Sequence, residues 1–531
     1  MDDDRLERTQ RRCGERLTRR DLLRMAAGGA GALALAPALG ARPARAGAAP
    51  SGRLTVGMGS IAPTLDPHRL VAAPATIPYY AMFDPLVTVK VTDPTVLEPA
   101  LATSWRNVND TTWEFRLRSG VRFHNGDGFS ARDVKFTIER ALNPDNKLPI
   151  RTRVASVKTV ETPDAMTVRI ITLEPDPILP KRLSTLFIVP ADYVAKAGAA
   201  GFEAKPVGTG AFQFKAFARG TAITLAAGPN SWRGAPKVAE VIIRNMPEPG
   251  VRVAALKTGE VDLIDGVPPD QAADLQRGGF AVSSAVRGAV FMYELGSILG
   301  LTPFKDKKVR QAVNYAIDKE ALVKEIMRGY GRPAQGQLVG SDAFGFAPNV
   351  PAYPYDPNKA RQLLAEAMYP NGFDTVISTT QGANPNDKEI TEAVVGYLQR
   401  VGVRAKIEIL QFAVFAQKFY DDKGGRGAMF AWAPAYYQVM DADFALNWFD
   451  SSRPEKRYNN PEFDRLYRAS RTEMNPQRRL QQLQQAAAVL REDPPAMFVL
   501  QPANVYAASR RVQGFTARPD VIITFDSIAK T

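Results

Sequence analysis

Residues 112–136 read TWEFRLRSGVRFHNGDGFSARDVKF, and this stretch decides the local fold of the first half of the chain. Its first residues alternate between apolar and polar side chains, with Trp113, Phe115 and Leu117 on one face, which predicts a β-strand. The Asn-Gly-Asp-Gly run at 125–128 predicts a turn. Ser130 is a good N-cap and Asp133 suits the positive end of a helix dipole, so we expect a helix to follow.

Strand and helix patterns alternate along the rest of the chain. Strand patterns cover residues 53–58, 166–173, 221–226, 238–244, 403–410 and 496–500. Helix starts in the second half share a capping side chain, at Asp306, at Asp318 and at the Asx-Pro pairs 356–357, 460–461 and 475–476. Strands interleaved with helices predict α/β or α+β domains.

The composition is that of a globular protein of several domains. The 531 residues are enough for two to four domains, since a domain takes roughly 100–200 residues. One Cys and two His exclude a disulfide scaffold, a zinc finger and a Cys-ligated cluster. The net charge of +13 is spread along the chain without a basic, aromatic-rich run, so we expect a solvated basic surface and no nucleic-acid partner.

The N-terminus has the layout of a secretory signal peptide. In residues 16–46 a basic stretch precedes an apolar run, and the small residues around Arg45 form a cleavage site. Arg19 and Arg20, followed by Asp-Leu-Leu, resemble the twin-arginine export motif. The apolar run is too short for a permanent membrane span, and Cys13 precedes it, where no lipid anchor is expected. We therefore expect residues 1–46 to be removed, which leaves a soluble periplasmic protein.

The catalytic and cofactor motifs that we sought are missing. Gly-x-Ser-x-Gly, His-Glu-x-x-His and the phosphate-binding Gly-x-x-x-x-Gly-Lys-Ser/Thr are absent. Only His68 and His124 are available as a base, and we interpret His124 as a structural histidine at the end of a strand. A pair of catalytic carboxylates is neither excluded nor selected by the sequence. The prediction is a protein without catalytic residues, bound cofactor or metal site.

Six motifs, in order, carry a family resemblance. They are 99–105 (PALATSW), 112–126, 130–136, 206–212 (PVGTGAF), 257–262 (KTGEVD) and 303–318 (PFKDKKVRQAVNYAID). Together they resemble family 5 extracellular solute-binding proteins, the peptide, dipeptide and nickel-type receptors of ATP-driven (ABC) importers. The resemblance covers about residues 53–525. We expect Gly208 and Gly210 of the fourth motif to serve a turn that needs positive φ.

The resemblance implies an α/β, two-lobed periplasmic binding protein fold with a hinge and an extra subdomain in the first lobe. Lobe I would comprise residues 50–86, 206–290 and 508–531, the subdomain 87–205 and lobe II 291–507. Two chain crossings, near 286–295 and 501–510, would form the hinge, and closure of the lobes would enclose the ligand. The expected partners are a peptide or peptide-like small solute and the permease subunits of an ABC importer. The protein itself is expected to be a monomer.

The resemblance points to residues 430–446 (FAWAPAYYQVMDADFAL) as the ligand segment. In peptide receptors of the family, the first Asp of this pattern holds the ammonium group of the peptide, but here Ala435 stands at that position. Asp441 is either its substitute or a helix cap. Without a carboxylate, burial of a free ammonium group is costly. A blocked peptide, an opine-like compound or another small amphipathic molecule is therefore an alternative ligand.

Aromatic side chains complete the predicted ligand site. Trp432, Tyr436 and Tyr437 suit stacking on a flat or apolar ligand, although each also suits a plain core position. Further candidates are Tyr293 after the first crossing, Phe346 in the loop 340–347 and Tyr79 in an early loop. Arg153 is a candidate for holding a carboxylate, with an exposed surface arginine as its alternative. Direct nickel ligation is disfavoured by the two His, although a nickel chelate remains a candidate cargo.

Two other classes of function stay open at this point. A secreted hydrolase would require a base and a nucleophile that the sequence does not display. A sensory or chaperone-like binder on the same fold would act without a permease, because a fold does not fix a function.

Overall fold

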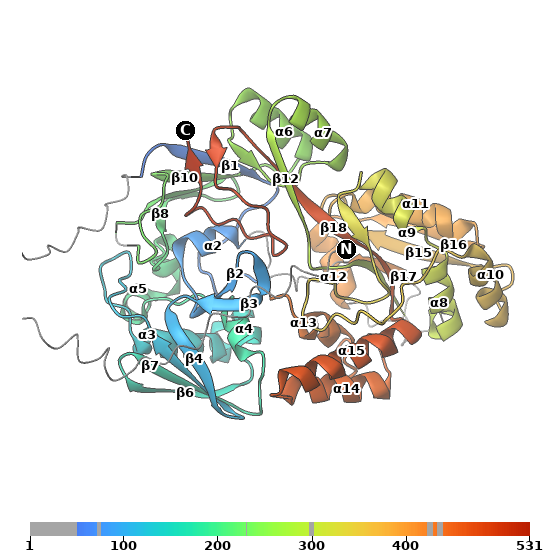
Figure 1. Cartoon of the computed structure of the whole chain (residues 1–531), viewed down its shortest axis with the longest axis horizontal. Coiled ribbons are helices and arrows are strands. Elements are labelled where there is room, and N and C mark those ends of the chain that lie inside the picture. Colours follow the sequence, from blue (N-terminus) through green and yellow to red (C-terminus); the bar gives the residue numbers. More distant parts are fainter. Residues whose placement is uncertain (1–49, 72–75, 230, 297–301, 422–427, 433–438) are drawn as a thin grey trace, which may run out of the picture. The chain divides into compact units, whose positions relative to one another are not determined.

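A computed structural model describes residues 50–71, 76–229, 231–296, 302–421, 428–432 and 439–531. Residues 48–531 form one compact unit, and the predicted export signal lies outside the described residues. The described chain has mixed α/β structure, as the alternation of strand and helix patterns predicts (Figure 1). Within the described ranges no helix is long and apolar enough to cross a membrane.

A twelve-stranded sheet runs through the unit. Its order is β16-β15-β17-β13-β18-β11-β1-β10-β9-β8, and β12 and β14 also pair with β18. The strands are β1 (Arg53–Met58), β8 (Phe212–Ala218), β9 (Ala222–Ala227), β10 (Glu240–Asn245), β11 (Leu263–Ile264), β12 (Ala281–Val286), β13 (Phe291–Leu295), β14 (Gly331–Pro333), β15 (Phe373–Thr379), β16 (Val403–Ile409), β17 (Ala428–Trp432) and β18 (Ala496–Ala508).

The strand β18 joins the two halves of this sheet. Its first part pairs with β13 and its last part with β12 and β11, and all thirteen of its residues are buried. The chain crosses a second time between β12 and β13. The two crossings lie side by side, because Gln501 donates to the carbonyl of Arg287 (2.9 Å) and Arg287 donates to the side chain of Asn504 (2.6 Å). The resemblance predicts a hinge near residues 286–295 and 501–510, and this hinge stays a prediction.

Helices cover both halves of the sheet (Figure 1). The first half carries α2 (Ile77–Met82), α6 (Pro249–Thr258) and α7 (Pro269–Arg277). The second half carries α8 (Lys307–Tyr315), α9 (Lys319–Ala321), α10 (Pro357–Glu366), α11 (Asp387–Gln399), α12 (Phe412–Asp421), α13 (Ala442–Leu446), α14 (Pro461–Thr472) and α15 (Pro476–Glu492). The predicted starts are confirmed, since each Asx side chain accepts a backbone N–H and each Pro opens its helix.

A smaller antiparallel sheet contains the stretch that opened the sequence analysis. Its order is β4-β5-β7-β6, built from β4 (Ala102–Asn109), β5 (Thr112–Leu117), β6 (Val157–Asp164) and β7 (Thr167–Thr172). It is accompanied by the hairpin of β2 (Val87–Lys90) and β3 (Asp93–Pro99) and by α3 (Ala131–Leu142), α4 (Leu179–Leu183) and α5 (Ala191–Ala204). The predicted helix start is confirmed, because Ser130 and Asp133 cap each other's backbone.

The prediction for Gly208 and Gly210 is wrong in its physical reason. Neither residue is among the glycines with positive φ. Instead, a Cβ at Gly208 would lie 2.1 Å from the carbonyl oxygen of Met82, and one at Gly210 would lie 2.2 Å from that of Ala81. Glycine is required here because two backbone segments approach too closely for any side chain.

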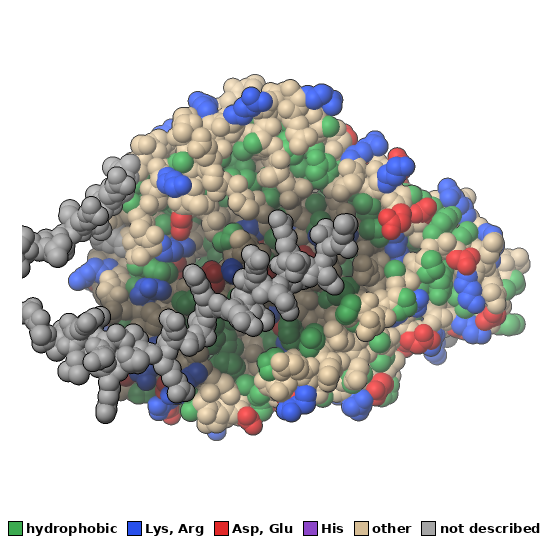
Figure 2. Space-filling model, in the orientation of Figure 1, with side chains coloured by type: hydrophobic (Ala, Val, Ile, Leu, Met, Phe, Trp, Pro, Cys, Tyr) green, Lys and Arg blue, Asp and Glu red, His purple; other side chains and the backbone are tan. Residues whose placement is uncertain are grey.

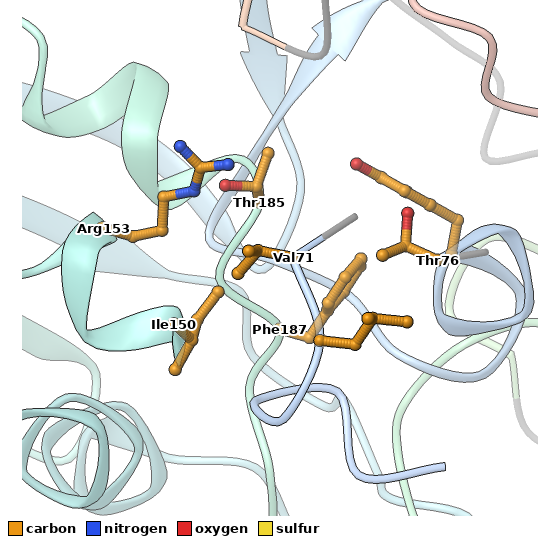
Figure 3. Close-up of a pocket in the computed structure, with 8 residues that line it drawn as sticks. Val71, Thr76, Ile150, Arg153, Thr185 and Phe187 are labelled. Atoms are coloured by element: carbon orange, nitrogen blue, oxygen red, sulfur yellow. The ribbon is translucent and has the colours of Figure 1, made fainter. Parts of the chain in front are cut away.

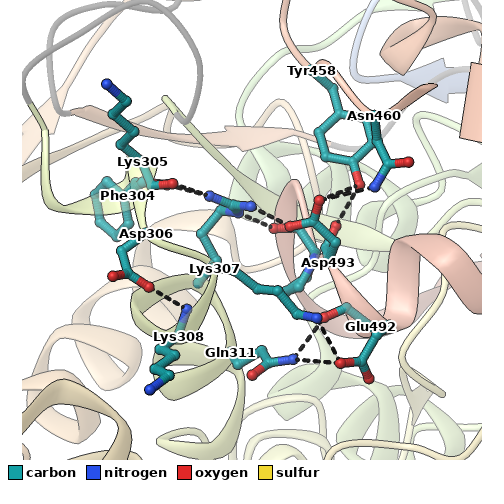
Figure 4. Close-up of polar contacts among 12 residues, drawn as sticks. Phe304, Lys305, Asp306, Lys307, Lys308, Gln311, Tyr458, Asn460, Glu492 and Asp493 are labelled. Carbon is teal, nitrogen blue, oxygen red and sulfur yellow. Dashed lines mark hydrogen bonds and ion pairs between the residues drawn. The ribbon is translucent and has the colours of Figure 1, made fainter. Parts of the chain in front are cut away.

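A buried arginine ties α8 to the end of α15 (Figure 4). Arg310 donates to the carbonyls of Phe304 (2.7 Å) and Pro494 (3.0 Å) and forms an ion pair with Asp493. Asp493 in turn accepts a hydrogen bond from the hydroxyl of Tyr458 (3.0 Å). Every charge in this cluster therefore has a partner, which is what burial of a charge requires.

Candidate functional site

The predicted ligand segment is only partly described. Trp432 closes β17, where its backbone pairs with Met292, and its side chain is not described. Ala435, Tyr436 and Tyr437 lie outside the described residues. Their proposed contacts with a ligand therefore stay predictions.

Asp441, which follows this segment, is already occupied. It is fully buried, and its carboxylate accepts two hydrogen bonds from Arg479, at 2.9 and 2.6 Å, and lies 3.4 Å from the ammonium of Lys181. It also caps α13 by accepting the backbone N–H of Asp443. Burial opposes the charged carboxylate, but the charges of Arg479 and Lys181 outweigh burial, so the pKa of Asp441 lies well below its usual value. The cap alternative is therefore observed, and the negative charge is balanced within the chain.

The loop that contains Phe346 packs against this cluster. Phe344 forms a backbone bridge with Asp441, and the cationic groups of Lys181 and Arg479 lie 5.2 and 5.1 Å from the centroid of its ring. Phe346 itself is half-buried against the neighbouring apolar core, and part of its ring surface stays accessible.

Tyr79 and Tyr293 lie in apolar cores. Both side chains are fully buried. The hydroxyl of Tyr79 donates to the carbonyl of Thr64 (2.7 Å), and that of Tyr293 shares a hydrogen bond with Thr391 (2.9 Å). Both hydroxyls are thus hydrogen-bonded within the chain, and the proposed contacts of the two tyrosines with a ligand stay predictions.

Arg153 is the predicted candidate that the structure places in a pocket (Figure 3). It ends the 3-10 helix Pro149–Arg153, and only 9% of its surface is exposed, so the surface-arginine alternative is wrong. Apolar side chains line the pocket, namely Leu70, Val71, Ile150 and Phe187. The remaining lining residues are Thr76, Tyr80 and Thr185, and Figure 3 shows the guanidinium group of Arg153 beside Thr185.

One face of the Arg153 guanidinium is covered from the other half of the chain. The centre of the group lies 4.9 Å from the centroid of the Phe444 ring, which belongs to α13. Burial is the main cause that lowers the pKa of Arg153 to about 10; Tyr80 opposes it and the positive charge of Arg182 adds to it. Among the described residues, contacts between 87–205 and 291–507 include Arg153 against Phe444 and Lys181 against Asp441 and Phe344.

The two histidines are fully engaged in structural contacts. His68 is buried, with Nε2 donating to the carbonyl of Phe187 (2.8 Å) and Nδ1 accepting from Arg140 (2.6 Å). Burial, together with the neighbouring charge of Arg140, lowers its pKa to about 4, although Asp66 opposes them. His124 donates to the carbonyl of Gly210 (2.9 Å) and accepts a backbone N–H. Both rings are held by hydrogen bonds to backbone groups and, for His68, to Arg140, and His124 is structural as predicted.

Two further observations concern charge. Within the described ranges no cluster of three or more His, Cys, Asp or Glu is arranged to hold a metal ion. On the face shown in Figure 2, basic side chains are dispersed among acidic and apolar ones, without a continuous basic patch.

Comparisons with known proteins define the class of this chain. The family model for bacterial extracellular solute-binding proteins, family 5, matches residues 96–456. The glutathione-binding protein GsiB of Pectobacterium atrosepticum is 30% identical, over 78% of this chain and 82% of that protein. Heme-binding protein A of Haemophilus influenzae is 30% identical, over 80% of this chain and 82% of that protein. The solved structure of the periplasmic binding protein AgaA from A. tumefaciens R10, in complex with agropinic acid, matches 90% of this chain and 99% of that one, at 25% identity and a TM-score of 0.77.

This chain therefore belongs to family 5 of the bacterial extracellular solute-binding proteins. Its α/β structure is the two-lobed fold of periplasmic binding proteins, and members of the family are binding proteins.

Proposed function

We propose that this chain captures a small solute between its two lobes and delivers it intact to the permease of an ABC importer. The observation that carries the proposal is the pair of adjacent crossings, β12–β13 and β18, which alone join the two halves of the large sheet within the described chain. Two adjacent crossings allow the halves to rotate as rigid bodies about a common axis. The contacts of Arg153 with Phe444 and of Lys181 with Asp441 would then form on closure.

The division into lobes follows the apolar cores. One core draws on residues 54–83, 211–263 and 506–528, which supports a lobe I of residues 50–86, 206–290 and 508–531, and it also takes in Phe187, Val189, Val194 and Phe202 of the neighbouring subdomain. A second core draws on residues 86–207 and supports a subdomain at 87–205. A third draws on residues 291–500 and supports a lobe II at 291–507. Each part with its own core is suited to move as a body.

The site also bears on the class of solute. Asp441 has its charge balanced by Arg479 and Lys181, and Ala435 stands where peptide receptors of the family carry an acidic residue. We therefore do not propose that residues 435 and 441 recognise the free N-terminus of a peptide. Glutathione, haem and agropinic acid, which name the ligands of three similar proteins, all carry carboxylate groups. We infer a peptide-like or opine-like small solute in which a carboxylate is a recognised feature.

Export completes the proposal. Residues 1–46 would direct the chain across the cytoplasmic membrane by the twin-arginine route and would then be removed, so that the mature monomer acts in the periplasm. The basic leader with its Arg19-Arg20 pair supports this.

Native mass spectrometry of protein purified from the periplasm tests the proposal. We expect one small solute per chain, released with unchanged mass, and a smaller radius of gyration by X-ray scattering when the stripped protein is reloaded. A chemically altered solute after incubation would favour a hydrolase. Equal dimensions with and without bound solute would contradict lobe closure.

A further inference from the structure

An ion pair joins two parts of the chain that have separate apolar cores. Lys181 lies in α4, within residues 87–205, and its ammonium nitrogen is 3.4 Å from a carboxylate oxygen of Asp441, the N-cap of α13. The side chain of Lys181 is only 16% exposed, and that of Asp441 is fully buried. Burial of an ion pair is costly when both partners must lose water, so the surroundings of Asp441 before the contact forms decide what the pair contributes.

The carboxylate of Asp441 is already held within residues 291–507, independently of Lys181. Arg479 donates two hydrogen bonds to it, at 2.9 and 2.6 Å, and the backbone N–H of Asp443 donates a third, at 3.1 Å. These donors displace most of the water around the carboxylate before residues 87–205 approach. The formation of the contact therefore adds little more than the dehydration of one ammonium group, whose charge the carboxylate then attracts at close range.

The surface that receives Lys181 also presents two aromatic rings to cations of the 87–205 part. The ammonium nitrogen of Lys181 lies 5.2 Å from the ring centroid of Phe344, and the guanidinium carbon of Arg153 lies 4.9 Å from that of Phe444. Phe344 forms a backbone bridge with Asp441, so this ring and the carboxylate belong to one surface. A ring face attracts a cation more strongly where water is excluded, so each of these contacts gains from the burial of the others.

Charges of opposite sign continue along the same contact. Asp443 of α13 is buried, and burial raises the pKa of its carboxyl, while the charge of Arg182 on α4 is the largest influence in the opposite direction. Arg471 of α14 lies 3.6 Å from Asp443 and also interacts with the charge of Asp176, which precedes α4 and pairs with Arg182. Ions of each part therefore face ions of opposite sign on the other part, which favours this one docked arrangement.

We propose that Lys181 is a positioning residue for lobe closure, and that its ion pair with Asp441 holds residues 87–205 against residues 291–507 before a solute is bound. The inference deepens the proposed function and rests on it. All of the contacts that carry it are made by side chains of the chain itself, so the closed arrangement is populated by the stripped protein. A solute that binds this arrangement better than the open one shifts the population further.

The experiment measures the distance between the two parts in the full chain, after export and removal of solute. The sequence has one cysteine, Cys13, which is replaced by serine, so that two introduced cysteines alone carry spin labels. Thr159→Cys in β6 and Ala488→Cys in α15 serve as the labelled positions, because both residues are exposed. Double electron–electron resonance then gives the distribution of distances between the two labels.

Five labelled proteins are compared. The protein with an intact Lys181 should give one narrow distribution at the shorter distance, and Lys181→Met should raise the ratio of long to short distances about tenfold, which corresponds to about 1.4 kcal/mol. Lys181→Ala repeats the removal in case the methionine variant does not fold. Lys181→Arg keeps the charge and should keep the shorter distance. Lys135→Met is the matched control, because Lys135 pairs with Glu139 inside the 87–205 part, and it should leave the distribution unchanged.

The outcomes separate this proposal from the proposed function. A long or broad distribution in the stripped protein with Lys181, or unchanged distances in both removal variants, overturns the positioning role. An equal opening in Lys181→Arg or in Lys135→Met also overturns it, because the effect would then not depend on this ion pair. If the role fails while native mass spectrometry still finds a retained solute, capture stands. If removal of Lys181 opens the stripped chain while the wild type retains no solute, the positioning role stands and the proposed capture function falls.

Discussion

Arg310 and Arg153 are both buried, and their surroundings differ in one respect. Arg310 donates to the carbonyls of Phe304, Lys305 and Pro494 and pairs with Asp493, whereas Arg153 lies against the ring of Phe444 and has no hydrogen bond or ion pair among the described residues. The first arrangement holds α8 to the end of α15 (Figure 4). The second leaves a charge that contributes little to folding. The difference teaches that the partners of a buried charge, rather than its burial, decide what the charge contributes to folding.

The largest expected effect is on the structural member of this pair. Arg310→Met should lower the free energy of unfolding by about 3–5 kcal/mol, because it leaves Asp493 and three carbonyl groups without their donor. Urea unfolding followed by circular dichroism measures the change. A loss below about 1 kcal/mol would mean that the Arg310 cluster is not structural and would remove the basis of the comparison.

Asp441→Asn should have the next largest effect and lower the free energy of unfolding by about 2–4 kcal/mol. The substitution leaves the charge of Arg479 buried without the carboxylate that pairs with it. The effect depends on pH. The pKa of Asp441 in the fold lies below its ordinary value of 3.8, so its contribution is present above about pH 4 and is lost as the pH falls further. The wild type should therefore lose stability more steeply than Asp441→Asn below pH 4 in acid titrations. Parallel curves for the two proteins would contradict the ion pair.

His68 should produce a smaller effect in a different pH window. Its pKa is lowered from 6.5 to about 4 by burial and Arg140, so the neutral ring stabilises the fold above pH 6.5 and this contribution is lost between pH 6.5 and 4. We expect about 1–2 kcal/mol less stability at pH 5 than at pH 7 from this residue. His68→Gln can make both hydrogen bonds without titrating, and its stability should change less between these two pH values. An equal change in both proteins would show that His68 does not titrate as described.

The smallest effect on stability is expected at Arg153. Arg153→Met should unfold within about 1 kcal/mol of the wild type, or be more stable, because methionine removes an unpaired buried charge and keeps the side-chain volume. Urea unfolding alongside Arg310→Met makes the comparison direct. A loss as large as that of Arg310→Met would show that Arg153 has a structural partner after all.

Local rules predicted much of the fold. Asp356, Asn460 and Asn475 cap their helices as the Asx-Pro pairs indicate, because capping depends on neighbours two or three residues away. Local rules do not predict the strand order of the large sheet, because β18 pairs with strands more than 200 residues distant in the sequence. Only the family resemblance indicated its crossings. The prediction that Gly208 serves a turn with positive φ is wrong, because the group that requires glycine there, the carbonyl of Met82, lies far away in the sequence.

The candidate site was less predictable for the same reason. Tyr293 has a hydroxyl partner 98 residues away, so the sequence alone does not distinguish a core tyrosine from a cleft tyrosine. Arg153 lies in an Arg-Thr-Arg run that looks like surface, and its burial depends on the pocket formed with Val71 and Phe187. The signal that identifies it, the missing acceptor, exists only in three dimensions. The acidic residues near Arg153 in the sequence do not reveal that its acceptor is missing.

A crystal structure of the chain with the solute that it retains from the periplasm is the most direct test of the account. The account predicts a closed pair of lobes with the solute, chemically intact, enclosed between them. A solute bound outside the space between the lobes would contradict it.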